Sequence, residues 1–175
     1  MSVIINGSAG VTTNSGAVYN GIASGTAVTA SGTSIDFTSI PSWVKRVTVM
    51  FSGVSTNGTS SLLLQIGDSG GIENTGYLGS CTQLVAGVGS VQGTAGFIIN
   101  QDSAANVHNG GLSISLLNST TNTWSAYGVF GQSNRAATVV VGGSKPLSAT
   151  LDRVRITTVN GTDTFDAGSI NILYE

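Results

Sequence analysis

Charged residues are scarce in this sequence. Only 8 % of its 175 residues are Asp, Glu, Lys or Arg, whereas about 25 % is usual for soluble domains. The net charge of −2 leaves no basic stripe of the kind that nucleic-acid-binding proteins need. Low charge does not predict disorder here, because 40 % of the residues are hydrophobic and the mean hydropathy is +0.27. We expect a folded protein that does not bind nucleic acid and whose surface suits packing against copies of itself.

Cysteines and long apolar runs are also lacking. The single cysteine, Cys81, excludes an internal disulfide. No run approaches the about 18 apolar residues of a membrane-spanning helix, so we expect no membrane partner. The first ten residues, MSVIINGSAG, have neither a basic region nor a sustained apolar core. We therefore expect no signal peptide and assembly in a cytoplasm.

The strongest pattern is an alternation of residues between Arg46 and Ser52. Val47, Val49 and Phe51 alternate with polar residues, which is typical of a half-buried antiparallel strand. Similar signals predict many further short strands. These are expected at Thr26–Ser31, Ser34–Phe37, Leu62–Gly67, Tyr77–Leu84, Gly96–Asn100, Leu112–Asn118, Trp124–Gln132, Ala136–Val141, Leu151–Val159 and Gly168–Tyr174, with the first signal extended to Val44–Ser55.

Turn dipeptides separate several of these segments, and no window has the 3.6-residue period of a helix. The predicted turns are at Asn57-Gly58, Asn109-Gly110, Gly142-Gly143 and Asn160-Gly161. We therefore predict an all-β fold, an antiparallel β-sandwich with jelly-roll-like winding, formed by residues 26–175.

Residues 1–25 contain no charge and many small residues, and we predict an extended N-terminal arm. One interpretation is a flexible tail, because chain ends are often poorly ordered. The other is an attachment segment that becomes ordered against a partner. Its candidate attachment residues are Val3, Ile4, Ile5 and Val11.

The segment Gly67–Gly71, GDSGG, matches the nucleophile box of chymotrypsin-like serine proteases. That chemistry needs a general base near the serine. The only histidine, His108, follows Ser69 in the chain, whereas the protease family places its histidine well before. We predict a hairpin loop at this segment, a solvated loop position for His108, and no catalytic residue.

Acidic residues offer only weak candidate sites. Asp68 and Glu73 could supply oxygens to Ca²⁺, but their spacing does not match an EF-hand loop. Asp163 and Asp166 could suggest a glycosidase pair, although acids in a polar hairpin are usually turn residues. We expect no metal, no cofactor and no enzymatic activity.

Three aromatic residues lie near loops rich in Ser, Thr and Asn. Tyr77, Trp124 and Tyr127 are therefore candidate platforms on which a sugar ring could stack. A core position is the alternative for Trp124, since it begins a predicted strand. On this basis a carbohydrate-binding module that recognises bacterial surface glycans is an alternative function.

Two long segments resemble proteins of tailed bacteriophages and prophages. They are Ile35–Tyr77, IDFTSIPSWVKRVTVMFSGVSTNGTSSLLLQIGDSGGIENTGY, and Leu151–Glu175, LDRVRITTVNGTDTFDAGSINILYE. Both resemble virion structural proteins of the short tail fibre or minor virion protein group. The run Val3–Thr13, VIINGSAGVTT, also resembles the short β-segments that begin many phage fibre modules.

This resemblance implies a non-enzymatic appendage on the virion surface, assembled as a homotrimer with other virion structural proteins in the host cytoplasm. It implies contact with the host surface and transfers no catalytic residue. The sequence departs from long fibres because it has no extended shaft. A short tail appendage and a capsid decoration protein on the head are therefore both open.

Overall fold

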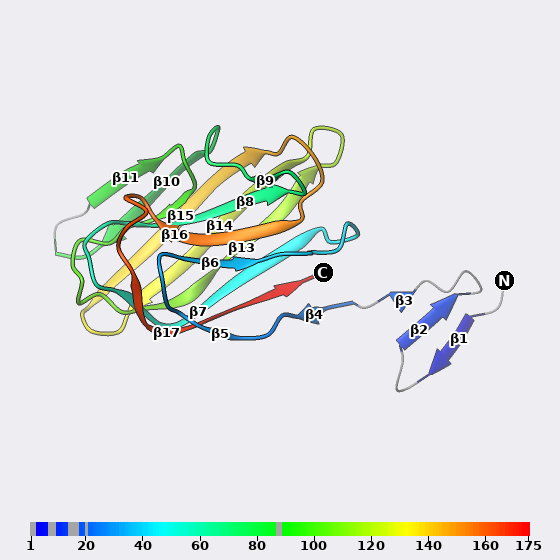
Figure 1. The fold of residues 1–175 in the computed structure, drawn as a ribbon, viewed down its shortest axis with the longest axis horizontal. Helices are drawn as coiled ribbons and strands as arrows, with labels where there is room; N and C mark the ends of the chain where they lie inside the picture. Colours follow the sequence, from blue (N-terminus) through cyan, green and yellow to red (C-terminus); the bar gives the residue numbers. More distant parts are fainter. Residues whose placement is uncertain (1–2, 7–9, 14–17, 20, 87–88) are drawn as a thin grey trace.

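The computed structural model describes residues 3–6, 10–13, 18–19, 21–86 and 89–175. In these residues the chain forms β-strands and turns and no helix, so no helix there could cross a membrane. Two antiparallel sheets of nine and five strands pack face to face, and a three-stranded sheet lies near the N-terminus (Figure 1). The predicted all-β sandwich is therefore confirmed.

The strands follow one another along the chain with short connections. Their bounds are β1 Val3–Asn6, β2 Gly10–Thr13, β3 Val18–Tyr19, β4 Ala23–Ser24, β5 Val28–Thr29, β6 Ser34–Phe37, β7 Arg46–Thr56, β8 Leu62–Asp68, β9 Gly71–Ile72, β10 Leu78–Leu84, β11 Gly89–Gly93, β12 Phe97–Ile99, β13 His108–Asn118, β14 Thr123–Gln132, β15 Ala137–Pro146, β16 Arg153–Thr158 and β17 Phe165–Tyr174.

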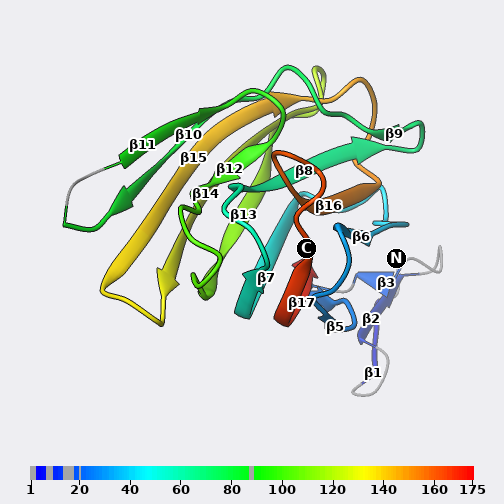
Figure 2. The same ribbon diagram turned by 60° about the vertical axis from the view of Figure 1, so that its left-hand side comes forward.

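The large sheet has the strand order β11-β10-β15-β14-β13-β7-β17-β4, with β5 also paired to β17. Figure 2 shows β11 to β17 of this order side by side as one continuous layer. The small sheet has the order β12-β8-β16-β6, with β9 paired to β8. All pairs within these sheets are antiparallel, as the alternating patterns and short connections in the sequence predict.

Three antiparallel pairs are nested in the chain. β7 pairs with β17, β8 with β16, and β10 with β15. The first and third pairs lie in the large sheet and the second in the small sheet, so the chain winds between the sheets in a jelly-roll-like manner. The β13–β14 hairpin is an addition to this winding, since it lies between β15 and β7 in the large sheet.

The predicted arm is divided between two sheets. β1 pairs with β2 and β2 with β3, and Ile5 lies opposite Val11 in the first pair. None of these three strands pairs with a sandwich strand in the part of the chain that the structure describes. β4, however, pairs with the last residues of β17, so residues 21–25 belong to the sandwich. The division at residue 25 stays a prediction, and β4 is the part of the predicted arm that pairs with a sandwich strand.

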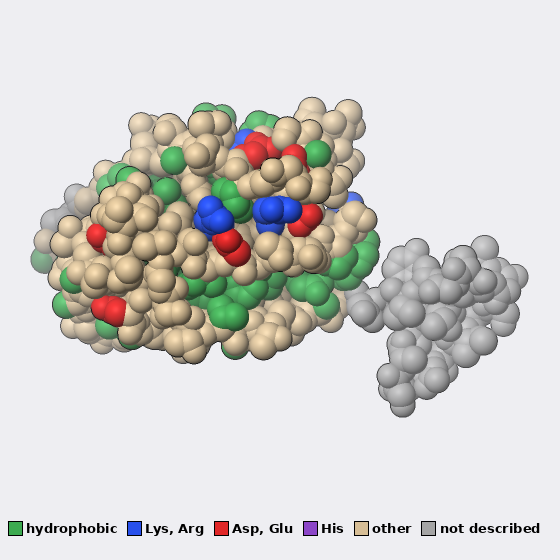
Figure 3. Space-filling model, viewed as in Figure 1, with side chains coloured by type: hydrophobic (Ala, Val, Ile, Leu, Met, Phe, Trp, Pro, Cys, Tyr) green, Lys and Arg blue, Asp and Glu red, His purple; other side chains and the backbone are tan. Residues whose placement is uncertain are grey.

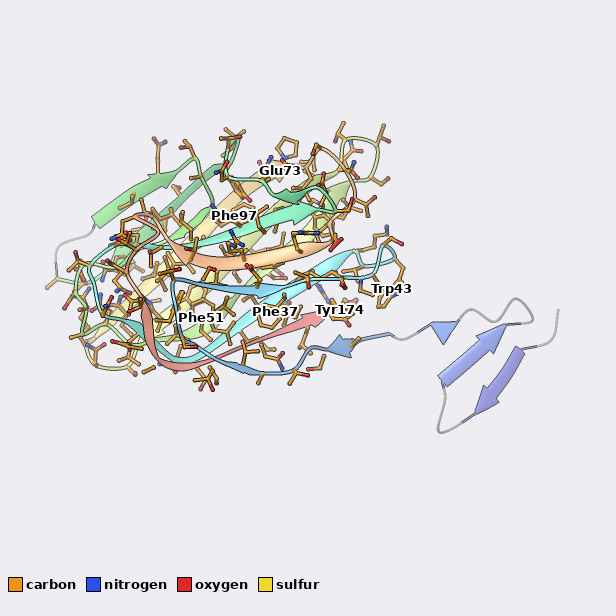
Figure 4. The ribbon with its side chains drawn as sticks, viewed as in Figure 1. Phe37, Trp43, Phe51, Glu73, Phe97 and Tyr174 are labelled. Carbon is orange, nitrogen blue, oxygen red and sulfur yellow. The ribbon has the colours of Figure 1, made fainter. Side chains whose placement is uncertain are left out.

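Aromatic side chains fill the core between the sheets. Phe51 of β7 meets Phe130 of β14 with ring centroids 5.1 Å apart, and Tyr77 meets Phe97 edge to face at the same separation. Figure 4 shows Phe51 and Phe97 within the sandwich and Trp43 near the C-terminal end of β17. Such offset and edge-to-face pairs stabilise a core by about 0.5–1.5 kcal/mol beyond the area they bury.

β8 is buried along its whole length, unlike β16 beside it, which alternates between buried and half-buried positions. Its inner face lies in the core, and the connection from β11 to β12 covers its outer face. Gln65 donates a side-chain hydrogen bond to the Ala95 carbonyl at 2.8 Å. Gly96 approaches so closely that a β-carbon there would lie 3.1 Å from side-chain atoms of Leu63 and Gln65. A β-carbon here would push its neighbours aside by a few tenths of an ångström, so this crossing favours glycine.

Two of the four predicted turns are wrong. Asn57-Gly58 and Asn160-Gly161 lie in turns, but Asn109-Gly110 lies within β13 and Gly142-Gly143 within β15. Gly110 has a φ of +131° beside a register shift against β7, so this glycine permits a β-bulge and not a hairpin turn. The predicted GDSGG hairpin is confirmed, because Asp68 pairs with Gly71 across Ser69 and Gly70.

The opposite orientations of two aromatic residues of β14, one inward and one outward, can be tested by mutation. Trp124 is 2 % exposed and Tyr127 is 61 % exposed. Trp124→Ala should lower the free energy of unfolding by about 3–5 kcal/mol, because it leaves a large cavity. Tyr127→Ala, its control, should change it by less than about 0.5 kcal/mol. Urea denaturation of both variants at low protein concentration measures this, and equal losses would contradict the inward and outward assignment.

Candidate functional site

The most distinctive surface of the molecule is the outer side of four neighbouring strands of the large sheet, β10, β15, β14 and β13. Four outward positions on each strand form a block of sixteen residues, and none of these is charged. We call this surface the neutral face. It consists of Leu78, Ser80, Thr82 and Leu84 of β10, Thr138, Val140, Gly142 and Ser144 of β15, Ser125, Tyr127, Val129 and Gly131 of β14, and Asn109, Gly111, Ser113 and Ser115 of β13.

The centre of the neutral face is apolar. Tyr127, Val129 and Val140 are 61 %, 53 % and 42 % exposed. Val129 lies opposite Val140 across the β14–β15 pair, and Tyr127 lies opposite Gly142. Serine and threonine surround this patch, and Ser113 lies opposite Tyr127 on its other side. About a quarter to a third of a typical protein surface is charged, so a face of this size without any charge suits contact with another molecule.

Charged residues gather elsewhere, several of them on the side of the small sheet. There Arg155 of β16 donates two hydrogen bonds of 2.7 Å to Asp36 of β6, and Arg153 lies 3.5 Å from Asp152. Figure 3 views the molecule from this side and shows blue and red side chains at its centre. The two sides of the sandwich therefore differ in chemistry, with ion pairs on one and a neutral surface on the other.

The structure corrects two of the three predicted sugar-stacking residues. Tyr77 is 1 % exposed, and its hydroxyl accepts from the Ile66 amide at 2.7 Å and donates to the Glu73 carbonyl at 2.9 Å. Burial raises the pKa of this phenol. Trp124 is a core residue. Both positions were assigned from nearby loop composition, which does not tell which way a strand residue points. Tyr127 is the one candidate of the three that is exposed.

The acidic candidates Asp68 and Glu73 come together, but with a cation of the chain beside them. Ser148 lies between the carboxylates, with its Oγ 2.8 Å from Asp68 Oδ2 and 2.6 Å from Glu73 Oε1. Lys145, whose side chain is 5 % exposed, forms an ion pair with Glu73. Its ammonium also lies 5.6 Å from the centre of the Tyr77 ring.

These contacts set the protonation of the carboxylate cluster. The Ser148 hydroxyl and the Gly70 amide lower the pKa of Asp68. Burial raises the pKa of Glu73, but the hydrogen bonds from Lys145 and Ser148 outweigh it, so the pKa is lowered. Both groups stay ionised at neutral pH, and Lys145 balances Glu73. This arrangement joins the β8–β9 hairpin to the segment after β15 and accounts for both acids as structural residues.

Asp163 lies in the connection before β17, as the sequence predicts, whereas Asp166 lies within β17 and is not a turn residue. Asp163 accepts hydrogen bonds from the Ser60 amide at 3.0 Å and the Asn160 side chain at 2.7 Å, which lower its pKa. Asp166 accepts from the Ser55 hydroxyl. The residues that the structure describes contain no group of three or more His, Cys, Asp or Glu side chains arranged to hold a metal ion.

His108 was predicted to be a solvated loop residue, and this is wrong. It begins β13 and is 0 % exposed. Gln101 Nε2 donates to Thr56 Oγ1 and the Gly58 carbonyl, so Gln101 Oε1 is an acceptor. His108 Nε2, 3.2 Å from that oxygen, must therefore carry the proton. No hydrogen bond joins His108 to Ser69 among the described residues, so the GDSGG serine has no histidine base here.

The other ring nitrogen of His108, Nδ1, lies in a buried environment where its protonation is unfavourable. Nδ1, the acceptor of this tautomer, has no hydrogen-bond partner in the described structure, and neither has the amide nitrogen of Gln132. The two residues are cross-strand partners between β13 and β14. Gln132 Oε1 already accepts from Gln83 and Arg135, so its amide must present N–H groups. A protonated Nδ1 would place a second donor in this buried environment.

A small cleft lies on the small-sheet side, between β8 and β11. Its volume is about 300 Å³, and its lining combines Leu63, Val91 and Ile98 with Ser61 and Thr94. The lining residues carry no charge, so the cleft suits an apolar or hydroxyl group. It is at the lower limit of the size of ligand pockets.

The sequence interpretation missed the neutral face apart from Tyr127. A signal was present, because β14 has apolar residues in both phases of its alternation. Trp124 and Phe130 occupy one phase and Tyr127 and Val129 the other. A strand that is apolar in both phases is typical of a sheet covered on both sides. In this chain only one of those sides is covered by the small sheet.

The buried histidine generates a pH test. Burial and the nearby Arg135 lower the pKa of His108 to about 4 against the opposing effect of Asp102, whereas the unfolded chain keeps the ordinary 6.5. The unfolded state therefore binds more protons below pH 6.5, and stability falls as the pH drops from 6.5 to 4. The loss should be about 3 kcal/mol in all, with about 2 kcal/mol between pH 7 and pH 5.

Denaturant titration at pH 7, 6 and 5 measures this loss. His108→Gln is the control, because it removes the titrating group while retaining a hydrogen-bonding side chain. The variant can be less stable at every pH, but its unfolding free energy should be nearly constant between pH 7 and pH 5. The same fall in both proteins would contradict the assignment to His108.

Comparison with known protein-family models found none that matches this chain, and comparison with curated proteins found no match either. The functional interpretation therefore depends on the residues of the chain, on their resemblance to phage proteins and on the geometry of the sandwich.

Proposed function

We propose that this protein is a non-enzymatic structural component of a bacteriophage virion, a short tail fibre or surface appendage that contacts the host. The observation that carries the proposal is the division of the chain into two parts. β1, β2 and β3 pair only with one another among the described strands, while residues 21 onward form the sandwich. A chain with this organisation has one part available for attachment and another available for display.

The composition of the N-terminal part suits attachment to protein. Residues 1–20 contain no charged side chain, so a virion partner could cover them without burying a charge. The candidate residues Val3, Ile4, Ile5 and Val11 all lie within β1 and β2. Three such segments around a common axis form the homotrimer that the resemblance implies. Copies of the chain and other virion proteins are its proposed partners, and no cofactor is needed.

The chemistry of the polar clusters fits a structural role. Lys145 and Glu73 neutralise each other, Asp163 accepts hydrogen bonds from the Ser60 amide and the Asn160 side chain, and Asp166 accepts one from Ser55 of β7. His108 is hydrogen bonded within the core to Gln101. The histidine and the acidic residues that the sequence offered for catalysis thus each have a structural contact.

The carbohydrate-binding alternative loses support. It required several exposed rings, and two of the three candidates are buried. Tyr127 alone remains, surrounded by serine, threonine and glycine. A single ring gives one stacking contact, so we do not propose glycan binding as the main function. A capsid decoration protein on the head would also need one part for attachment and one for display. The two-part organisation therefore fits the head as well as the tail.

Deletion of residues 2–20 tests the proposal. The shortened protein keeps β4 and β5, which pair with β17, so its thermal midpoint should stay within about 2–4 °C of that of the full chain. It should, however, no longer enter phage particles when it replaces the full protein in an infected or induced host.

Quantitative mass spectrometry of purified particles measures incorporation, with the full chain as the reference. Separation of heads from tails then assigns the full protein to one of them. Incorporation of the shortened protein at the normal copy number would overturn the attachment role. Absence of the full protein from purified particles would overturn the virion assignment itself.

A further inference from the structure

We propose that two copies of this chain pack against each other through the neutral face, with Tyr127 of each copy seated over Gly142 of the other. This inference goes beyond the virion role and does not depend on it, since it concerns the sandwich and not the N-terminal strands. It rests on the charge, size and shape of the face.

The absence of charge favours a second copy as the occupant. When a surface meets its own copy near a twofold axis, each charge lies near an identical charge and both lose their water. The sixteen positions formed by four outward residues on each of four strands contain no Asp, Glu, Lys, Arg or His. The opposite side carries the Arg155–Asp36 and Arg153–Asp152 pairs. Of the two broad sides of the described sandwich, the neutral face is therefore the one that allows self-contact without burying charged groups.

The size of the face is sufficient for a weak specific interface. Four strands at a spacing of about 4.8 Å and four outward positions at about 6.7 Å along each strand give about 500 Å² per copy. Two copies would bury about 1,000 Å² together, which is near the lower limit for specific protein contacts. We therefore expect dissociation in the micromolar range, because interfaces of this size seldom bind more tightly without exceptional anchors.

The shape of the face is self-complementary. Tyr127 projects from β14, and the residue opposite it on β15 is Gly142. A β-carbon at Gly142 would meet no atom within 4 Å, so this glycine is not required by the fold. It leaves a hollow beside a projecting ring. A twofold axis near this pair places each ring over the other copy's glycine, which is the reciprocal contact that an isologous interface requires.

The centre of the face also has the composition of an interface core. Val129 and Val140 lie beside the tyrosine and are half exposed. Aromatic residues are enriched and charged residues depleted at the centre of protein interfaces. Glycine within a strand weakens the strand and often marks a place where another chain approaches closely. Contact with a second copy would explain why the outer face of these strands carries Gly142, Tyr127 and Val129.

Light scattering and sedimentation equilibrium of the full chain test the proposal over about 5–500 µM, the range in which an interface of about 1,000 Å² should assemble. Val129→Lys introduces a charge at the centre of the face. Val159→Lys is the matched control, because Val159 is 57 % exposed against 53 % for Val129 and lies outside the neutral face.

At high concentration, the mass of the wild-type protein should be twice that of the Val129→Lys variant. The Val159→Lys variant should behave as the wild type. The ratio is two for a monomeric 17.6 kDa chain; a trimer joined by the N-terminal strands would carry three neutral faces, so its ratio would be two or more. The proposal would be overturned if the Val129→Lys variant associated as strongly as the wild type. It would also be overturned if the wild-type protein did not associate at any concentration in this range.

A second variant tests the seating of the tyrosine. Gly142→Val fills the hollow, and valine suits a strand, so the thermal midpoint should stay the same or rise. The dimer dissociation constant should increase at least about tenfold because the ring loses its place. Unchanged association of a folded Gly142→Val protein would overturn the proposed contact between Tyr127 and Gly142.

Discussion

The structure depends on one constraint, the alternation of side chains along each strand. In β14 this alternation sends Trp124 and Phe130 into the core and Tyr127 and Val129 to the outside. The inward residues fix the register, because a shift by one position would exchange the two sets. The same constraint that builds the core therefore also builds the neutral face. Its apolar residues cannot turn inward, since the small sheet already occupies that side.

Most of the few charged residues meet a partner of opposite charge or a hydrogen-bond donor. Arg155 is held by Asp36, Arg46 by Glu175, and Lys145 by Glu73. Only the last pair includes a nearly buried cation, which must be balanced because an unpaired buried charge is strongly destabilising. The exposed pairs contribute little to stability. These pairs instead determine where charge lies on the surface, which is on the small sheet, in the loops and at strand ends.

The sequence was sufficient for the fold class and for most strands, because period-two alternation is a local signal. It predicted β6 at its bounds in the structure and β8, β10 and β14 to within one residue at each end. It failed where the decisive information is non-local. Gly110 and Gly142 look like turn residues, but their φ angles and surroundings depend on strands far away in the chain. His108 is buried and hydrogen bonded to Gln101, which in turn donates to Thr56 of β7, and the residues next to His108 in the chain do not signal this network.

The proposed attachment strands and the neutral face act in different ways on assembly. A face that buries about 1,000 Å² holds free copies only weakly. Copies fixed to one particle by their N-terminal strands are instead present at a high local concentration, and a weak contact between them then becomes effectively intramolecular. Since the face carries no charge, this contact should also be insensitive to salt. A sandwich with a neutral side can thus remain separate in dilute solution and still form pairs where its N-terminal strands gather it.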